Sequence, residues 1–237
     1  MCSFLAAACT CLPPFMASIA DPANGQDESC PHYYVLINNV AKKTNVGNMM
    51  RSACAFNAKG MLVVGRKKSV SFFGSKGTKS FVPLLYFDSM DEACGYARND
   101  GCSICGVEIL DQSKNVVSHP FSGPTCFIMG NEGVGLMESE KAFCDFFVYI
   151  PHFGNGTASL NVTVAASIVF HHFATYAKYS ERKRSGQKFV VADKPVLDQN
   201  NTAYAQKVKM ERLRAKEAAA GDAVDMSTGG MNMFAED

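Results

Sequence analysis

The sequence predicts an α/β fold in which a mostly parallel sheet carries helices on both faces. Several short runs are apolar throughout instead of alternating with polar residues, which is typical of strands buried on both faces. Segments with helical spacing separate these runs, as the crossovers of a parallel sheet require. With 237 residues, 47% of them hydrophobic and 19% charged, the chain has room for one core with tails.

The predicted strands are apolar runs between turn-forming residues. In chain order they cover residues 33–37, 61–64, 84–87, 103–110, 126–129 and 146–150. A turn at residues 111–115 follows the fourth strand.

Three segments have the pattern of helices. Segment 45–56 places apolar residues on one face, at Val46, Met49, Met50, Ala53 and Phe56. Segment 90–99 is a second, shorter helix. Segment 159–176 is apolar nearly all round, so we expect it in the core or in a subunit interface.

The ends of the chain depart from this pattern. Residues 1–30 contain no Lys or Arg, which predicts a disordered tail and not a signal or transit peptide. Residues 31–180 form the predicted folded domain, residues 181–220 a basic helical extension, and residues 221–237 a second disordered tail. Residues 178–216 hold 11 Lys and Arg against 4 Asp and Glu, which favours a polyanionic partner.

The ten cysteines lack the spacing of a disulfide framework, so we expect reduced thiols inside the cell. Cys102 and Cys105 form a C-x-x-C pair in a predicted strand, without a second pair at zinc spacing. A structural zinc or redox role is the alternative to our prediction of no metal site. His171 and His172 are predicted to form hydrogen bonds in the core or in an interface, and not to bind metal.

The first of three polar stretches is NVGNMMR, residues 45–51, which leads from a strand into a helix. Asn45 or Asn48 can cap this helix, and Arg51 lies inside it on a face away from the apolar stripe. Arg51 is either a solvated residue of a capped helix or a guanidinium fork for a phosphate or ribose oxygen.

The second stretch is GNEGVG, residues 130–135, which follows a predicted strand. Its glycines tolerate positive φ and let backbone amides approach a ligand closely. Their spacing matches neither the dinucleotide fingerprint nor the P-loop. A plain tight connection is the alternative.

The third stretch is IPHFGNGTASLNV, residues 150–162, where a strand and a glycine-rich loop lead into the long helix. Thr157 or Ser159 is expected to cap that helix, with Asn161 in its first turn. The alternative is a capped buried helix without a further role. A buried unpaired amide costs about 1–3 kcal/mol, so Asn161 needs a partner.

In this order, each at a strand-to-helix junction, the three stretches resemble the motifs of the SpoU/TrmH-type RNA ribose 2'-O-methyltransferases of the SPOUT superfamily. The resemblance covers roughly residues 33–178, although the loop from Pro151 to Ser159 is one residue longer than the common form. It implies an α/β domain with a C-terminal deep trefoil knot, from about Cys126 through Val164. It also implies a homodimer that packs the long helix against its mate.

The resemblance implies S-adenosyl-L-methionine as the cofactor. The positions that would hold it are Met129, Gly130, Asn131, Gly135, Ile150, Ser159 and Leu160. The family's polar active-site positions match Asn45, Arg51, Glu132, Ser159 and Asn161.

Arg51 of one subunit would reach the cofactor of the other. With a reference pKa above about 12, an arginine is a demanding choice of base. We therefore expect Arg51 to hold the phosphate beside the target nucleotide and to stabilise the alkoxide that forms when the ribose 2'-OH loses its proton. Asn45, Ser159 and Asn161 would orient the ribose, and Glu132 would support its loop.

Structured RNA is the predicted partner. Two basic patches are candidates for binding it, and a merely solvated surface is the alternative. The first patch contains Arg66, Lys67, Lys68, Lys76 and Lys79. The second contains Arg182 and Arg184. Phe72 and Phe73 could stack on bases, although burial in the core is the favoured prediction.

The sequence thus predicts methyl transfer to a ribose 2'-OH, with tRNA ahead of rRNA because no separate RNA-binding domain precedes the predicted catalytic one. The alternative from another class is a non-catalytic RNA-binding homodimer of the same fold. A nucleotide-dependent oxidoreductase is disfavoured because the glycine fingerprint is missing. No apolar run of about 18 residues occurs, so we expect no membrane span. A cytoplasmic location is predicted, with a nuclear or mitochondrial one left open.

Overall fold

The computed structural model describes residues 30–38, 43–65, 75, 77–131 and 133–192. The predicted tails at residues 1–29 and 221–237 therefore lie outside the described residues, as does the part of the basic extension from residue 193.

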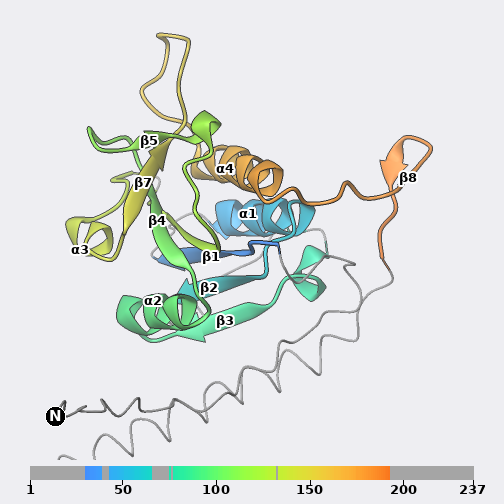
Figure 1. The fold of residues 1–237 in the computed structure, drawn as a ribbon, viewed down its shortest axis with the longest axis horizontal. Helices are drawn as coiled ribbons and strands as arrows, with labels where there is room; N and C mark the ends of the chain where they lie inside the picture. The colour runs from blue at the N-terminus through green and yellow to red at the C-terminus, as the bar shows by residue number, and fades with distance from the viewer. Residues whose placement is uncertain (1–29, 39–42, 66–74, 76, 132, 193–237) are drawn as a thin grey trace, which may run out of the picture.

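A seven-stranded sheet forms the centre of the fold, and every neighbouring pair of its strands is parallel (Figure 1). The strand order is β3-β2-β1-β6-β4-β7-β5. The strands are β1 (Tyr33–Asn38), β2 (Gly60–Val64), β3 (Leu84–Phe87), β4 (Ser103–Val107), β5 (Lys114–Asn115), β6 (Thr125–Met129) and β7 (Phe146–Tyr149). The predicted parallel sheet is confirmed, whereas the trefoil knot stays a prediction.

Helices cover both faces of the sheet, as the continuous apolar strands required. On one face α1 (Lys43–Ala55) packs against α4 (Val162–Tyr176), and both contribute to a core that includes Met49 and Phe170. On the other face α2 (Met90–Asn99) contributes Ala93 and Ala97 to a second core. Figure 1 shows α1 and α4 together on one side of the sheet and α2 on the other.

The predicted strand 103–110 is too long, because β4 ends at Val107. The Ser113 hydroxyl donates to the Glu108 carbonyl over 2.8 Å and accepts the Leu110 amide over 3.1 Å. The Glu108 carbonyl and the Leu110 amide are thus bonded to a side chain and not to a neighbouring strand. The two bonds close a turn. The predicted turn at 111–115 also contains β5, which pairs with β7 at the edge of the sheet.

The predicted helix caps are wrong at the first and the third polar stretch. Helix α1 begins at Lys43, so Asn45 and Asn48 lie inside it. Helix α4 begins at Val162, with Asn161 as its N-cap accepting the Thr163 amide over 2.9 Å. Thr157 and Ser159 both precede that N-cap, and the Thr157 hydroxyl is bonded to the backbone of Ser159 instead.

The C-x-x-C pair does not form a common site. Cys105 belongs to the core on the α1 and α4 face, and Cys102 belongs to the core on the α2 face. Successive side chains of a strand alternate between its faces, which places residues three apart on opposite sides. Burial raises the pKa of the Cys102 thiol to about 12, which makes it a poor nucleophile and ligand at neutral pH.

The described start of the basic extension contains a short hairpin, and the predicted helical part from residue 193 onward lies outside the described residues. Strands β8 (Arg184–Ser185) and β9 (Lys188–Phe189) pair antiparallel, and Gly186 adopts φ 59° in the turn between them. The hairpin stands apart from the sheet (Figure 1). Among the described residues, no helix has the length and apolar character needed to cross a membrane.

A cluster of polar side chains links separate segments of the chain near the amino ends of the strands. The Asp100 carboxylate accepts hydrogen bonds from Tyr34 over 2.8 Å and from Lys59 over 2.6 Å, and His32 lies 2.9 Å away. Burial alone would raise the pKa of Asp100, but the hydrogen bonds from His32, Lys59 and Tyr34 hold it well below its usual value. The cluster therefore stabilises the fold most when Asp100 is ionised.

Asp100→Asn is expected to lower the free energy of unfolding at neutral pH by about 1–3 kcal/mol. Because the pKa of Asp100 is lower in the folded state, its contribution is present above the unfolded pKa of about 3.9 and is lost as pH falls toward the folded pKa. The variant should therefore lose less stability than the wild type on acidification below about pH 5. Urea unfolding followed by circular dichroism measures this, with Asp111→Asn at an exposed turn position as the control.

Candidate active site

A pocket of about 450 Å³ lies at the carboxyl ends of β4, β6 and β7. Ligand sites of open parallel sheets lie at this edge, and the volume is within the range of small-molecule sites. Its walls come from the ends of the three strands, the glycine turn, α3 (Glu138–Lys141), and the loop and first turn of α4.

The glycine turn closes on itself through two backbone hydrogen bonds. The Asn131 amide donates to the Gly135 carbonyl over 3.0 Å, and the Gly135 amide donates to the Asn131 carbonyl over 2.9 Å. Gly135 adopts φ +69°, where side chains are rarely accommodated. A Cβ at Gly130 would lie 2.8 Å from the Gly135 carbonyl carbon. Both glycines are therefore required by the shape of the turn.

Gly130→Ala is expected to lower the free energy of unfolding by about 1–3 kcal/mol, because the clash is with backbone atoms that cannot rotate away. Gly133→Ala is a control in the same turn, where the nearest atom to a new Cβ is Asn131 Oδ1 at 3.5 Å. Thermal unfolding of both variants checks the prediction. Equal losses in the two variants would show that the close approach at Gly130 is unimportant.

A polar contact beside the pocket joins the first and third stretches. Asn45 is 6% exposed, and its side-chain oxygen lies 3.3 Å from the Thr163 hydroxyl and 3.4 Å from the Asn161 amide nitrogen. Ser52 of α1 and Ser167 of α4 add a hydroxyl contact of 2.7 Å. Asn161 is exposed, so the burial that would have required a partner is absent, yet its side chain bonds both to Asn45 and to the Thr163 amide.

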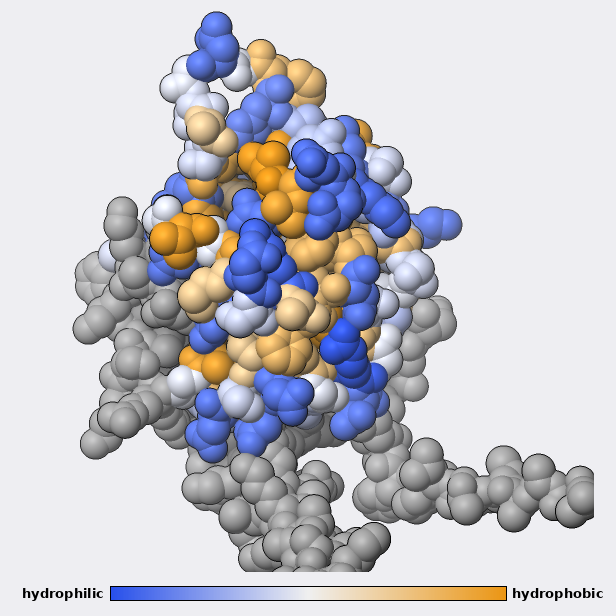
Figure 2. Space-filling view, turned by 90° about the vertical axis from the view of Figure 1, so that its left-hand side faces the viewer, coloured by the Kyte–Doolittle hydropathy of each residue, from blue (hydrophilic) through white to orange (hydrophobic). Residues whose placement is uncertain are grey.

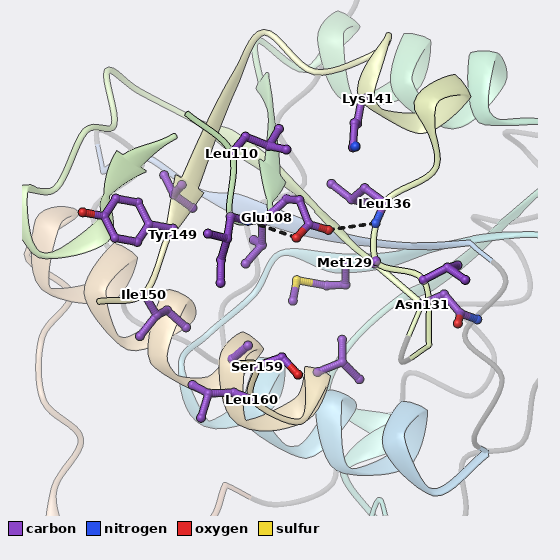
Figure 3. A pocket seen from close by; sticks show the side chains of 18 of the residues that line it. Glu108, Leu110, Met129, Asn131, Leu136, Lys141, Tyr149, Ile150, Ser159 and Leu160 are labelled. Atoms are coloured by element: carbon purple, nitrogen blue, oxygen red, sulfur yellow. Dashed lines mark hydrogen bonds between the residues drawn. The ribbon is translucent and has the colours of Figure 1, made fainter. Parts of the chain in front are cut away.

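Most of the side chains that line the pocket are apolar, and several polar ones lie among them (Figure 3). One of these is Glu108, which the sequence analysis missed. It lies at the middle of the pocket and accepts the Leu136 amide over 2.9 Å (Figure 3). Its position directly after a strand is the signal that could have identified it, but the predicted strand ran past it.

Lys141 of α3 also lines the pocket and was missed. Its ammonium lies 2.7 Å from the Glu138 carboxylate. The hydrogen bond from Lys141 to Glu138 raises the pKa of Lys141, and the charge of Glu108 acts in the same direction. The lining of the pocket therefore includes one ammonium, which is paired with a carboxylate of its own helix.

Apolar side chains are exposed beside the pocket. Ile109 and Val134 line it and are 58% and 73% exposed. Figure 2 views the molecule from the side on which α3 lies, where apolar residues gather amid hydrophilic ones. This edge offers apolar contact area to a ligand.

The structure brings the residues expected to bind the cofactor into one pocket. All of them line it, namely Met129, Gly130, Asn131, Gly135, Ile150, Ser159 and Leu160. Among the expected polar active-site residues, Ser159 is in the pocket, and Asn45 and Asn161 are in contact with each other. Arg51 is exposed on α1 and does not line the pocket of its own chain. Glu132 lies outside the described residues.

The predicted RNA-binding residues are described only in part. Arg182 and Arg184 are exposed at the hairpin. Only the backbone of Lys79 is described, within a short 3-10 helix at Thr78–Ser80. The others lie outside the described residues, namely Arg66, Lys67, Lys68 and Lys76 with Phe72 and Phe73.

A parallel sheet with a pocket at the carboxyl ends of its strands, walled by a glycine turn, defines an α/β protein of the class whose ligand sites lie at this edge. Comparison with known families is more specific. The model of the SpoU rRNA Methylase family matches residues 32–171. The chain belongs to this family.

Individual relatives agree with this assignment. A Mycolicibacterium vanbaalenii protein described as an uncharacterized tRNA/rRNA methyltransferase is 28% identical over 169 residues, which are 69% of this chain and 53% of the relative. The chain thus spans about half the length of that curated relative.

Two solved structures share the fold. The SpoU methyltransferase AviRb from Streptomyces viridochromogenes, in complex with the cofactor AdoMet, has a TM-score of 0.55 and 24% identity, covering 64% of this chain and 60% of that one. The A. aeolicus TrmH/SpoU tRNA modifying enzyme has a TM-score of 0.58 and 20% identity, covering 75% and 89%.

Proposed function

We propose that this protein transfers a methyl group from S-adenosyl-L-methionine to a ribose 2'-OH of structured RNA, with tRNA ahead of rRNA. The observation that carries the proposal is the convergence of the glycine turn and the third stretch on one pocket, with the Asn45–Asn161 contact beside it. Membership of the SpoU rRNA Methylase family supports RNA methylation.

The pocket suits S-adenosyl-L-methionine. Its volume of about 450 Å³ is ample for an adenosine with a short chain. Met129, Ile150 and Leu160 offer apolar surface for a base, and the glycine turn brings backbone amides to the wall without Cβ atoms in the way. The AviRb structure with AdoMet, although it shows only the same fold, is in keeping with this choice.

When bound, the cofactor supplies an electrophilic methyl group on a sulfonium. The chain's own residues must then hold the ribose hydroxyl in line and favour loss of its proton, which are effects of positioning and of acid–base catalysis. Ser159 lines the pocket and can hold the ribose, and Asn45 and Asn161 fix the start of α4 beside it. Arg51 would come from the partner subunit of a homodimer.

The outer side of α4 supports the proposed homodimer. Val164 is 48% exposed in a helix that is otherwise mostly apolar, and His171 is also exposed. These two positions lie on the side of α4 that faces away from the core, and the proposed homodimer would pack through that side. RNA would be held in part by the exposed basic hairpin, where Arg184 pairs across the strands with Phe189.

The test combines cofactor binding with product mapping. We expect calorimetry to show binding of S-adenosyl-L-methionine, and the protein to methylate RNA from cells that lack its gene. The modified linkage should resist alkaline hydrolysis, because hydrolysis needs the free 2'-OH. Methylation on a base would overturn the ribose assignment. RNA binding without cofactor binding would favour the non-catalytic homodimer.

A further inference from the structure

We infer that Glu108 binds the two ribose hydroxyls of the cofactor's adenosine, as a pair of fixed acceptors at the centre of the pocket. This inference rests on the proposed function, since it takes an adenosine-containing cofactor as the ligand.

The carboxylate of Glu108 is held in place by backbone donors. Oε2 accepts the Leu136 amide over 2.9 Å, and Oε1 accepts the amide of Ile109 over 3.0 Å. A carboxylate has about four lone-pair positions, so each oxygen retains capacity for one more donor. Figure 3 shows the carboxylate reaching into the pocket between Leu110 and Met129. Its orientation is therefore set before any ligand arrives.

The surroundings of Glu108 make it the natural acceptor for a polar part of the ligand. Among the described residues that line the pocket it is the one acid, and its neighbours there include Leu110, Met129 and Leu136. A ligand that covers this carboxylate must supply hydrogen-bond donors, because a buried acceptor without a donor is costly. Two adjacent hydroxyls match two adjacent acceptor oxygens, the arrangement by which acids bind ribose in dinucleotide sites.

The cofactor's ammonium is the other donor group that a carboxylate could bind, and the geometry favours the hydroxyls. The two oxygens of Glu108 are fixed by separate backbone amides, so they face the pocket as two acceptors. Two vicinal hydroxyls can each donate to one of these oxygens, whereas the ammonium is a single nitrogen.

The absence of a side chain at Gly135 makes room for the same carboxylate. A Cβ at this position would overlap Glu108 Oε2, and the backbone there has φ +69°. The glycine turn thus leaves room for Glu108 to approach its backbone, which explains why the carboxylate can bond to the next residue, Leu136.

The test is a set of binding measurements by calorimetry that varies the ligand and the protein together. The ligands are S-adenosylhomocysteine, 5'-methylthioadenosine, which lacks the amino-acid part, and 2'-deoxy-5'-methylthioadenosine. The proteins are wild type, Glu108→Gln, and Glu138→Gln as a control that removes the other carboxylate near Lys141 from outside the pocket.

We expect wild type and Glu138→Gln to bind methylthioadenosine about 10- to 100-fold more tightly than its 2'-deoxy form, the range for a hydrogen bond to a charged group. In Glu108→Gln this preference should fall below about threefold, and both adenosylhomocysteine and methylthioadenosine should weaken alike. A variant whose turn is merely distorted would weaken the 2'-deoxy ligand equally and keep the preference.

Three outcomes overturn the inference. A preference for the 2'-hydroxyl that persists in Glu108→Gln excludes the ribose as the partner of Glu108. A loss confined to adenosylhomocysteine assigns the carboxylate to the ammonium. A wild-type protein that binds none of the three ligands overturns the proposed function itself, and with it this inference.

Discussion

Arg51→Ala is expected to lower kcat for RNA methylation by about 10²- to 10⁴-fold while the affinity for S-adenosyl-L-methionine stays unchanged. The residue is exposed on α1 and lines no part of its own chain's pocket, so its removal leaves the walls of that pocket unchanged, and we expect its partner-subunit role to concern the RNA phosphate and not the cofactor. Arg51→Lys keeps the charge but loses the planar fork, and should recover only a small part of the rate. Single-turnover rates with saturating RNA, beside calorimetry with the cofactor, measure both quantities.

A mixed dimer tests whether Arg51 acts across the subunit interface. Ser159→Trp is expected to fill the pocket and abolish cofactor binding, but this chain still carries Arg51. A hybrid dimer contains one Ser159→Trp chain and one Arg51→Ala chain. One of its two sites is complete, because the Arg51→Ala chain supplies the open pocket and the Ser159→Trp chain supplies the arginine. Random pairing should therefore restore about a quarter of the wild-type sites, since half of the dimers of a two-fold assembly are hybrids.

The mixed sample would stay inactive if Arg51 served its own chain's pocket, because every chain would then lack one of the two features. Full wild-type activity of Arg51→Ala alone would remove the residue from the mechanism.

The sequence predicted the parts of this fold that depend on local pattern. The run YYVLIN of β1 is largely apolar on both faces, and this strand lies inside the sheet between β2 and β6. The bounds of β3 and α2 agree with the predicted segments 84–87 and 90–99. Buried parallel strands and a helix capped by Ser89 leave strong local signals.

The features that were missed depend on contacts between distant segments. Glu108 became visible as a pocket residue only because β4 ends at Val107 and the chain returns at Leu136. Asn161 is the cap because α4 begins only at Val162, after residues 157–160 have been used to form the pocket loop, and no spacing rule reveals that start. Helix α3 is only Glu138–Lys141, too short for a helical period to stand out.

Glu140 illustrates how such a contact supports the site. It is 3% exposed on α3, which follows the glycine turn. Its Oε1 accepts the Asn38 side-chain amide over 2.7 Å, and its Oε2 accepts the Met137 backbone amide over 2.8 Å. One buried carboxylate thus ties the carboxyl end of β1 to the segment that carries the glycine turn.

Glu140→Leu is expected to lower the free energy of unfolding by about 2–4 kcal/mol, because it removes two hydrogen bonds to a buried carboxylate and leaves two partly buried donors without an acceptor. For a domain of this size that corresponds to a fall in Tm of roughly 5–15 °C. Glu138→Gln, on the same helix and 89% exposed, should change the stability by less than about 0.5 kcal/mol.

Adding Asn38→Ala to Glu140→Leu separates the two donors. The double variant should recover part of the loss, since one donor without a partner is then gone, and the Met137 amide accounts for the remainder. If Glu140→Leu were as stable as the wild type, the link between β1 and the glycine turn would not contribute to folding. The turn would then depend on its own backbone bonds between Asn131 and Gly135 and on the bond from Leu136 to Glu108.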